Sequence, residues 1–156
     1  MKNKSFQELL PDFESVLTNS PLYHGLEQFY FRDYHEDLIE NKRTGLEREQ
    51  QVKEELEEKY PLEKGYTILS EIYLRDENGK SVADPVTGER RRVDFAVIRN
   101  NQVIEMIEVT SLTADKQLQI AKENRIREAG GNYIRNQNGE LCKIPDSMHT
   151  KIERRT

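Results

Sequence analysis

Two apolar runs on either side of Asn100-Asn101, followed by a polar helical segment, constrain the fold of this chain more than any other feature. Residues 91–99 and 102–110 have the length and composition of β-strands, and the Asn pair between them is a turn signal. Residues 113–129 have helical spacing, with Thr113 as the predicted N-cap and Gly130-Gly131 as the C-terminal stop. The pattern predicts an antiparallel hairpin followed by a helix.

The clearest helix of the sequence lies earlier, at residues 44–59. Thr44 is its predicted cap, and Pro61 follows its predicted end. Residues 66–75 then predict a strand, one face of which carries Ile68, Ile72 and Leu74.

Turns and short strands fill the rest of the second half. Turn signals at 76–79 and 84–88 enclose a short predicted edge strand at 81–83. Residues 132–135 and 140–144 predict two further strands. The order of elements predicts an α/β (α+β) fold with a central mixed β-sheet flanked by helices.

The chain of 156 residues is long enough for one domain with a small extension. We predict a helical N-terminal extension over 1–43 and the main domain over 44–156. Within the extension, residues 5–18 predict a short helix and residues 22–42 one or two helices. The extension is polar and aromatic and shows no catalytic pattern, which is typical of a packing segment or a linker.

Composition excludes several classes of protein. A single cysteine, Cys142, rules out an internal disulfide framework and a zinc site built from cysteines. No apolar run approaches the ~18 residues that a membrane-spanning helix needs, and the first residues lack the apolar core of an ordinary signal peptide. The net charge of −5 is unevenly spread, because residues 1–89 hold 11 basic and 20 acidic side chains, whereas residues 90–156 hold 13 and 9. The basic half is the half with the candidate site.

Each strand of the predicted hairpin carries a carboxylate. Asp94 shares a strand face with Ala96 and Ile98, where a carboxylate is costly unless it is paired or binds a metal; the structural alternative is an ion pair with Arg90, Arg91 or Arg92. The register of the hairpin decides which glutamate of the second strand it faces. A two-residue turn sets Asp94 opposite Ile107 and beside the face of Glu105. A three-residue loop, Asn100 to Gln102, sets Asp94 opposite Glu108. We favour the second register, because it builds a metal site and leaves Glu105 for solvent or the rim.

Polar side chains follow the second carboxylate. Thr110 and Ser111 carry hydroxyls that can orient a water molecule or a phosphate oxygen, or simply cap the next helix. Lys116 and Gln119 lie three residues apart and therefore on one side of that helix. A lysine that reaches the carboxylates would stabilise developing charge on a phosphate.

The earlier helix offers a third carboxylate, Glu49, in competition with Glu47, Glu54 and Glu55. Basic residues along the second half are candidates for phosphate contacts; they are Arg92, Lys122, Arg125, Arg127, Arg135, Lys143, Lys151, Arg154 and Arg155. Tyr133 could stack on a base, although a strand tyrosine more often belongs to the core.

These residues occur in an order that resembles the PD-(D/E)XK nuclease superfamily: a helix with Glu, a strand with Asp, a strand with E-x-K, then a helix. More narrowly, the segments RRVDF, IEVTSLTADKQLQ, NRIREAGGNYIR and NGEL are similar to C-terminal toxin domains of polymorphic and contact-dependent inhibition (CdiA-type) effectors. The resemblance covers residues 45–155.

The resemblance implies that Glu49, Asp94 and Glu108 hold a divalent metal, Mg²⁺, Mn²⁺ or Zn²⁺. The chain departs from the superfamily pattern at position 110, which is Thr where E-x-K has Lys. On this interpretation Lys116 supplies the missing amine from the helix, with Thr110 and Gln119 assisting.

The resemblance further implies a nuclease that cleaves RNA or DNA, is part of a secreted or cell-surface effector, acts in the cytoplasm of a rival bacterium, and has a cognate immunity protein. RNA, and tRNA in particular, is slightly favoured, because an acidic chain needs a structured target that local basic patches can hold. Two alternatives stay open: a non-catalytic binding module for nucleic acid or protein on a nuclease-like scaffold, and a restriction- or repair-type DNA endonuclease.

Overall fold

The computed structural model describes residues 21–156, with side chains from residue 35 onward. The helix predicted at 5–18 lies outside the described residues. The chain divides into two compact units, Met1–Thr44 and Gly45–Thr156. The second unit carries the central β-sheet and the hydrophobic cores on its two faces.

A single long helix, α3 (Pro21–Lys59), replaces the separate helices predicted on either side of Thr44. The predicted cap is wrong, because the Thr44 hydroxyl donates to the carbonyl of Glu40 within the helix, 2.8 Å away. Proline occurs at Pro21, the first helical position, and next at Pro61, so no proline interrupts the residues between. As predicted, the helix ends just before Pro61, and a short 3₁₀ turn, η1 (Leu62–Lys64), follows.

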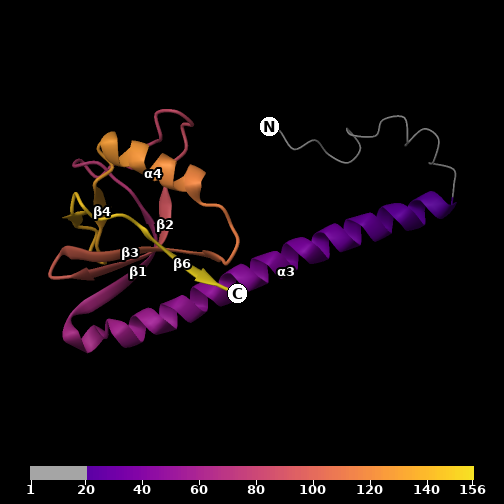
Figure 1. Ribbon diagram of the computed structural model, residues 1–156, viewed down its shortest axis with the longest axis horizontal. Coiled ribbons are helices and arrows are strands. Elements are labelled where there is room, and N and C mark those ends of the chain that lie inside the picture. The colour runs from indigo at the N-terminus through magenta and orange to yellow at the C-terminus, as the bar shows by residue number, and fades with distance from the viewer. Residues whose placement is uncertain (1–20) are drawn as a thin grey trace. The chain divides into compact units, whose positions relative to one another are not determined.

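The central sheet has four strands in the order β1-β2-β3-β6 (Figure 1). Their bounds are β1 (Tyr66–Tyr73), β2 (Arg92–Arg99), β3 (Gln102–Ser111) and β6 (Lys151–Arg155). The first three strands form an antiparallel meander, and β6 pairs in parallel with β3, so the sheet is mixed, as predicted. Strand β6 was not predicted from the sequence.

The β2–β3 hairpin combines features of both registers considered for it. Asn100 and Asn101 form a two-residue turn with φ of 51° and 58°, conformations that Asn tolerates well. The predicted three-residue loop is therefore wrong. A β-bulge then shifts the register, because Ile98 pairs with Val103 whereas Val97 pairs with Glu105, leaving Ile104 as the extra residue. Beyond the bulge the pairing matches the register that we favoured.

Two hydrophobic cores cover the two faces of the sheet. Val52 and Leu56 of α3 pack with Phe95, Val97 and Ile107 on one face. On the other face, Ile126 of α4 (Gln117–Glu128) packs with a second set of sheet residues, Ala96, Ile98, Val103 and Met106. Figure 1 shows α4 lying across this second face. Strand alternation places Asp94 on the face that α4 covers.

Strand β1 departs from the alternation predicted for it. Ile68 packs into the α3-side core, whereas Ile72 and Leu74 belong to the α4-side core. Glu71 lies between them with a left-handed φ of 55°. The prediction of one shared face is wrong because this residue reverses the alternation.

Helix α4 is shorter than predicted and begins later. Thr113 is not its cap; Lys116 occupies the N-cap position, and Asp115 Oδ1 accepts a hydrogen bond from the backbone N–H of Gln117, 2.9 Å away. The predicted glycine stop is confirmed, since Gly130 has a φ of 102° and Gly131 donates to the carbonyl of Ile126.

The remaining short strands lie outside the central sheet. The strands β4 (Tyr133–Arg135) and β5 (Leu141–Lys143) form a separate two-stranded sheet. The predicted edge strand at 81–83 is present only as isolated bridges, Arg75 with Ser81 and Ala83 with Arg90. No helix among the described residues combines the length and apolar character needed to cross a membrane.

The contact between α3 and the sheet predicts a clear difference between two leucines of the same helix. Leu56 is 6% exposed and Leu46 is 57% exposed. Leu56→Ala should lower the free energy of unfolding by about 2–5 kcal/mol, because it leaves a cavity in the α3-side core. Leu46→Ala should change it by less than about 0.5 kcal/mol. Urea denaturation of both variants tests this, and equal losses would contradict the packing.

Candidate active site

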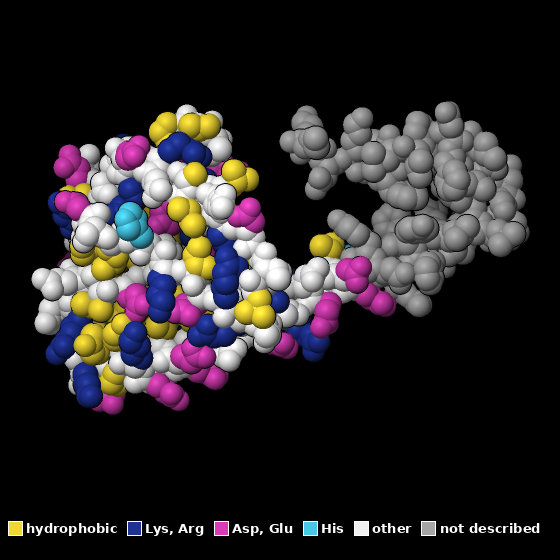
Figure 2. Space-filling model, viewed as in Figure 1, with side chains coloured by type: hydrophobic (Ala, Val, Ile, Leu, Met, Phe, Trp, Pro, Cys, Tyr) yellow, Lys and Arg dark blue, Asp and Glu magenta, His cyan; other side chains and the backbone are white. Residues whose placement is uncertain are grey.

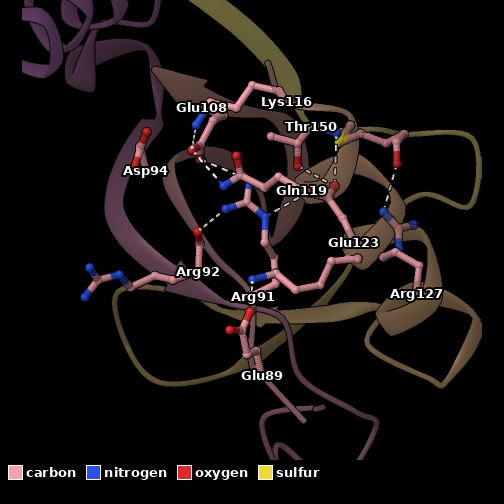
Figure 3. Close-up of polar contacts among 12 residues, drawn as sticks. Glu89, Arg91, Arg92, Asp94, Glu108, Lys116, Gln119, Glu123, Arg127 and Thr150 are labelled. Carbon is pink, nitrogen blue, oxygen red and sulfur yellow. Dashed lines mark hydrogen bonds and ion pairs between the residues drawn. The ribbon is translucent and has the colours of Figure 1, made fainter. Parts of the chain in front are cut away.

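Glu108 of β3 is the centre of a buried polar cluster under α4. Its Oε1 accepts hydrogen bonds from Gln119 Nε2, 2.9 Å away, and from Lys116 Nζ, 3.3 Å away. Its Oε2 lies 3.0 Å from Arg91 Nη2. Figure 3 shows these three side chains converging on the carboxylate. Lys116 and Gln119, which we expected on one side of this helix, thus both contact Glu108.

Arg91 links Glu108 to a second buried carboxylate. Its Nε lies 3.2 Å from Oε2 of Glu123 on α4, and its Nη1 donates to the carbonyl of Arg92. Glu123 Oε1 in turn accepts from the hydroxyl of Thr150, 2.5 Å away, and from its backbone N–H. Arg91, Glu108 and Glu123 are each less than 8% exposed, so the two buried carboxylates are balanced only when the charge of Lys116 is added to that of Arg91.

Asp94 lies next to this cluster on β2 and on the same face of the sheet. Its Oδ2 accepts a hydrogen bond from the backbone N–H of Val109, 2.7 Å away. Burial raises the pKa of Asp94 to about 6, and the negative charges of Glu108 and Glu49 act in the same direction against the hydrogen bond from Val109. The structural alternative of a direct ion pair with Arg90, Arg91 or Arg92 is not observed among the described contacts.

The third predicted carboxylate, Glu49, lies within electrostatic range of the other two. Burial raises its pKa, and the charges of Glu71 and Glu108 add to that shift. Glu71 is the strand residue with the left-handed φ of 55°, a strained conformation that is common beside functional sites. Glu105, by contrast, lies away from this cluster: it accepts from the Tyr60 hydroxyl, 2.6 Å away, instead of facing solvent.

The loop between β3 and α4 delivers Lys116 to Glu108, and Arg154 of β6 holds this loop. One guanidinium nitrogen, Arg154 Nη1, donates to the carbonyls of Ser111 at 3.0 Å, Leu112 at 3.4 Å and Ala114 at 2.9 Å. Thr110, paired with Arg154 across the parallel strands, is buried at the end of β3. The last strand thus fixes the path of the chain between Glu108 and Lys116.

The cluster forms the floor of an open pocket of about 340 Å³. Helix α4 forms one wall and the segment 149–152 forms the other, and the residues that line the pocket include Arg91, Glu108, Lys116, Gln119, Glu123 and Thr150. A charged floor with a lysine and an amide is suited to an anionic ligand. Asp94 is not among the lining residues, so it approaches Glu108 from outside this pocket.

Oxygen donors of the kind that Mg²⁺ and Mn²⁺ prefer are present in Asp94, Glu49 and Glu108. Burial is the main cause of the raised pKa values of Asp94 and Glu49, and a divalent cation would oppose the smaller contribution that comes from repulsion between carboxylates. Across residues 35–156, no group of three His, Cys, Asp or Glu side chains is arranged to hold a metal ion. Both oxygens of Glu108 already accept from Arg91, Lys116 and Gln119. A hard cation held by Asp94 and Glu49 therefore stays a prediction, supported by the carboxylate oxygens of these two residues.

Three of the predicted phosphate contacts have a different role in the structure. Arg125 makes two hydrogen bonds, 2.8 and 2.7 Å, to the buried carboxylate of Asp84. Arg127 donates to Asn132 Oδ1 and to the carbonyls of Met148 and Pro145, and Arg135 donates to the carbonyls of Gly139 and Gly79. These guanidinium groups stabilise turns and loops, and we no longer assign them to substrate.

The other predicted cations differ in how firmly they are paired. Arg92 is half exposed and lies 3.4 Å from Glu71, and Lys122 lies 2.8 Å from Glu89. Lys151 and Arg155 both pair with Glu153 of the same strand, β6. Arg92 and Lys122 remain the best candidates for phosphate contacts, because both pair with exposed carboxylates.

Sequence reasoning did not assign Arg91, Glu123, His149 and Thr150 to the site. Arg91 was considered only as a partner for Asp94, and Glu123 resembled any other charged helix residue. Glu123 lies four residues after Gln119, on the same side of α4, and this spacing was the one available signal. Comparisons of the chain with protein-family models, with curated proteins and with solved structures found no match.

The raised pKa of Asp94 predicts how stability depends on pH. Between the ordinary pKa of Asp, 3.8, and the folded value of about 6, the Asp94 carboxyl is mostly protonated in the folded protein and mostly ionised in the unfolded chain. Ionisation of Asp94 therefore destabilises the fold as the pH rises through that window. Asp94→Asn should therefore raise the free energy of unfolding at neutral pH by about 1–2 kcal/mol, a value reduced for solvent screening, and the gain should vanish near pH ~4.

Urea denaturation at both pH values measures this difference. Asp84→Asn is the control of opposite sign, because the hydrogen bond from Arg125 holds the pKa of Asp84 well below its usual range. That variant should be less stable than the unsubstituted protein at neutral pH. An Asp94→Asn protein that is destabilised at neutral pH as much as Asp84→Asn would contradict the raised pKa of Asp94.

The loop contacts of Arg154 predict a local effect on backbone mobility. Arg154→Ala removes three carbonyl contacts, so amide hydrogen exchange across 111–116 should become about five- to tenfold faster. Exchange measured by mass spectrometry tests this. Arg135→Ala removes comparable carbonyl contacts elsewhere and should leave 111–116 unchanged; acceleration by both variants would indicate general loosening of the fold.

Proposed function

We propose that this chain is a metal-dependent nuclease that hydrolyses phosphodiester bonds, acting as an antibacterial toxin domain. The observation that carries the proposal is the convergence of Lys116 and Gln119 on Glu108, with Asp94 on the neighbouring strand. The elements carry these residues in the order helix, strand, strand, helix, as in the superfamily that the sequence resembles. Lys116, at the start of α4, reaches Glu108. In an E-x-K motif the lysine of the same strand would lie beside this carboxylate.

Each side chain has a distinct part in this proposal. Lys116 places a positive charge where negative charge develops on the phosphate. Gln119 and Arg91 hold the Glu108 carboxylate in one orientation through both of its oxygens. Asp94 and Glu49 would hold the divalent cation, with Mg²⁺ or Mn²⁺ favoured over Zn²⁺ by the absence of His and Cys from this donor set. When bound, such a cation polarises the phosphate and lowers the pKa of a bound water.

RNA, with tRNA first, is the proposed substrate, and DNA is the alternative. In the described residues of Figure 2, basic and acidic side chains are mixed over the visible face of the sheet domain. A surface of this kind is suited to local contacts with a structured target rather than to uniform contact along a duplex. The toxin proposal also includes a cognate immunity protein and delivery into a rival cell.

A non-catalytic binding module is a second candidate, because one specific observation favours it. Glu108 is saturated by Arg91, Lys116 and Gln119, and its charge is balanced within the cluster. An arrangement of this kind can be purely structural. The module would bind nucleic acid or protein without cleaving it, and a catalytic assay separates the two functions.

Incubation of the purified protein with total tRNA and with plasmid DNA, with and without Mg²⁺ or Mn²⁺, tests the proposal. We expect metal-dependent cleavage, tRNA being cut in preference. Asp94→Asn should lower turnover by about a hundredfold or more, since it weakens a cation ligand. Lys116→Ala should lower kcat by about tenfold to a hundredfold with little change in KM, because its charge acts mainly on the transition state.

Lys80→Ala is the matched control, because Lys80 is an exposed lysine outside the pocket lining and was not assigned to substrate. It should retain full turnover. Absence of cleavage with every metal would favour the binding module. Loss of activity that is equal for Lys116→Ala and Lys80→Ala, and is reversed at low salt, would reduce Lys116 to a general phosphate contact.

A further inference from the structure

The pocket above Glu108 is a cleft between two segments that are far apart in sequence. Gln119, Ile120 and Asn124 of α4 line one side, and His149, Thr150 and Ile152 line the other. Glu108 lies at its floor, and Ile152 is the direct β6 neighbour of Glu108 in the parallel pairing. Each wall therefore contacts Glu108, one through Gln119 and the other through the pairing of Ile152.

The two walls combine apolar surface with unused polar groups. Ile120 on α4 and Ile152 on β6 each contribute an apolar side chain. Asn124 and His149 are exposed, and among the described residues neither side chain makes a hydrogen bond or an ion pair. An amide and an imidazole can donate and accept hydrogen bonds at once. Apolar walls with a few polar groups at the edge are typical of sites for flat heterocyclic ligands.

The cleft also continues beyond its polar rim. Asn124 and His149 border a second hollow, about 440 Å³ in volume, which is lined by Arg127, Asn132 and Asp146 as well. A ligand in the first cleft can therefore extend past these two residues into the second. A continuous path of this kind is suited to a polymer chain better than to a closed small molecule.

We propose that the cleft between α4 and the segment 149–152 binds one unstacked nucleobase of the substrate, beside the phosphate held at Lys116. Asn124 and His149 would contact the polar edge of the base, and Ile120 and Ile152 would contact its faces. A pocket of about 340 Å³ is at the small end of the range for small-molecule sites, ~300–1,000 Å³. This volume is sufficient for a single base.

The inference rests on the proposed nuclease function and narrows its substrate class. A base inside the cleft has left its stack, so the substrate must present a single-stranded or splayed nucleotide at the cleavage position. Loops of structured RNA supply such nucleotides without the cost of opening a duplex. The cleft therefore selects for RNA loops over continuous double-stranded DNA.

Binding of the four nucleoside 5′-monophosphates, with ribose 5-phosphate as the ligand without a base, tests the inference without any cleavage. At least one nucleotide should bind the unsubstituted protein about tenfold more tightly than ribose 5-phosphate, the equivalent of one or two hydrogen bonds. The doubly substituted protein, Asn124→Ala with His149→Ala, should lose this advantage and keep the affinity for ribose 5-phosphate. Both residues are exposed, so the double variant should fold, and thermal unfolding checks this.

Gln137→Ala is the control for the loss of an exposed amide, since Gln137 lies outside both hollows. It should keep the full advantage of the nucleotide over ribose 5-phosphate. Equal affinity of the unsubstituted protein for all five ligands would overturn the inference. Retention of the base-dependent advantage by the double variant would overturn it as well.

Cleavage assays on the same proteins separate this inference from the proposed function. If the double variant still cleaves tRNA but its cut sites lose their preference for the neighbouring base, both proposals are supported. Base-dependent binding without cleavage under any metal would reject the nuclease and keep the cleft. Cleavage without base-dependent binding would reject the cleft and keep the nuclease.

Discussion

Burial of Glu108 beneath helix α4 places a requirement on every element around it. A carboxylate that is removed from water needs opposite charge and hydrogen-bond donors at close range. Arg91 directly before β2, Lys116 at the start of α4 and Gln119 one turn later supply them. Arg91 then needs a second carboxylate, Glu123, which in turn needs Thr150. The position of β6 and the start of α4 both follow from this chain of contacts.

The same charge balance bears on whether the protein is a metal-dependent nuclease or a non-catalytic binding module. Glu108 and Glu123 are matched by Arg91 and Lys116, so a cation that draws on Glu108 must compete with Lys116 and Gln119. Asp94 and Glu49 make no ion pair among the described contacts, and burial, with repulsion from neighbouring carboxylates added to it, raises their pKa values. The site thus contains one neutralised half and one half with excess negative charge.

Local signals explain which parts of this arrangement could be predicted from the sequence. The hairpin, the glycine stop after α4, and the placement of Lys116 and Gln119 on one side of that helix depend on spacings within about thirty residues, where turn chemistry and helix periodicity decide. Strand β6 could not be predicted, because Lys-Ile-Glu-Arg-Arg has little apolar character and gains its strand conformation by pairing with β3. The Arg91–Glu123 pair joins residues 32 apart, and only the packed fold brings them together.

The bulge at Ile104 has a consequence at the level of the gene. Beyond the bulge, the alternation of side chains along β3 turns Glu108 toward α4 and Glu105 toward Tyr60. Loss of the single codon for Ile104 would leave a regular hairpin, because Glu105 would follow Val103 directly and still pair with Val97. Both glutamates would keep their present faces, whereas loss of one codon between Glu105 and Glu108 would turn Glu108 to the opposite face.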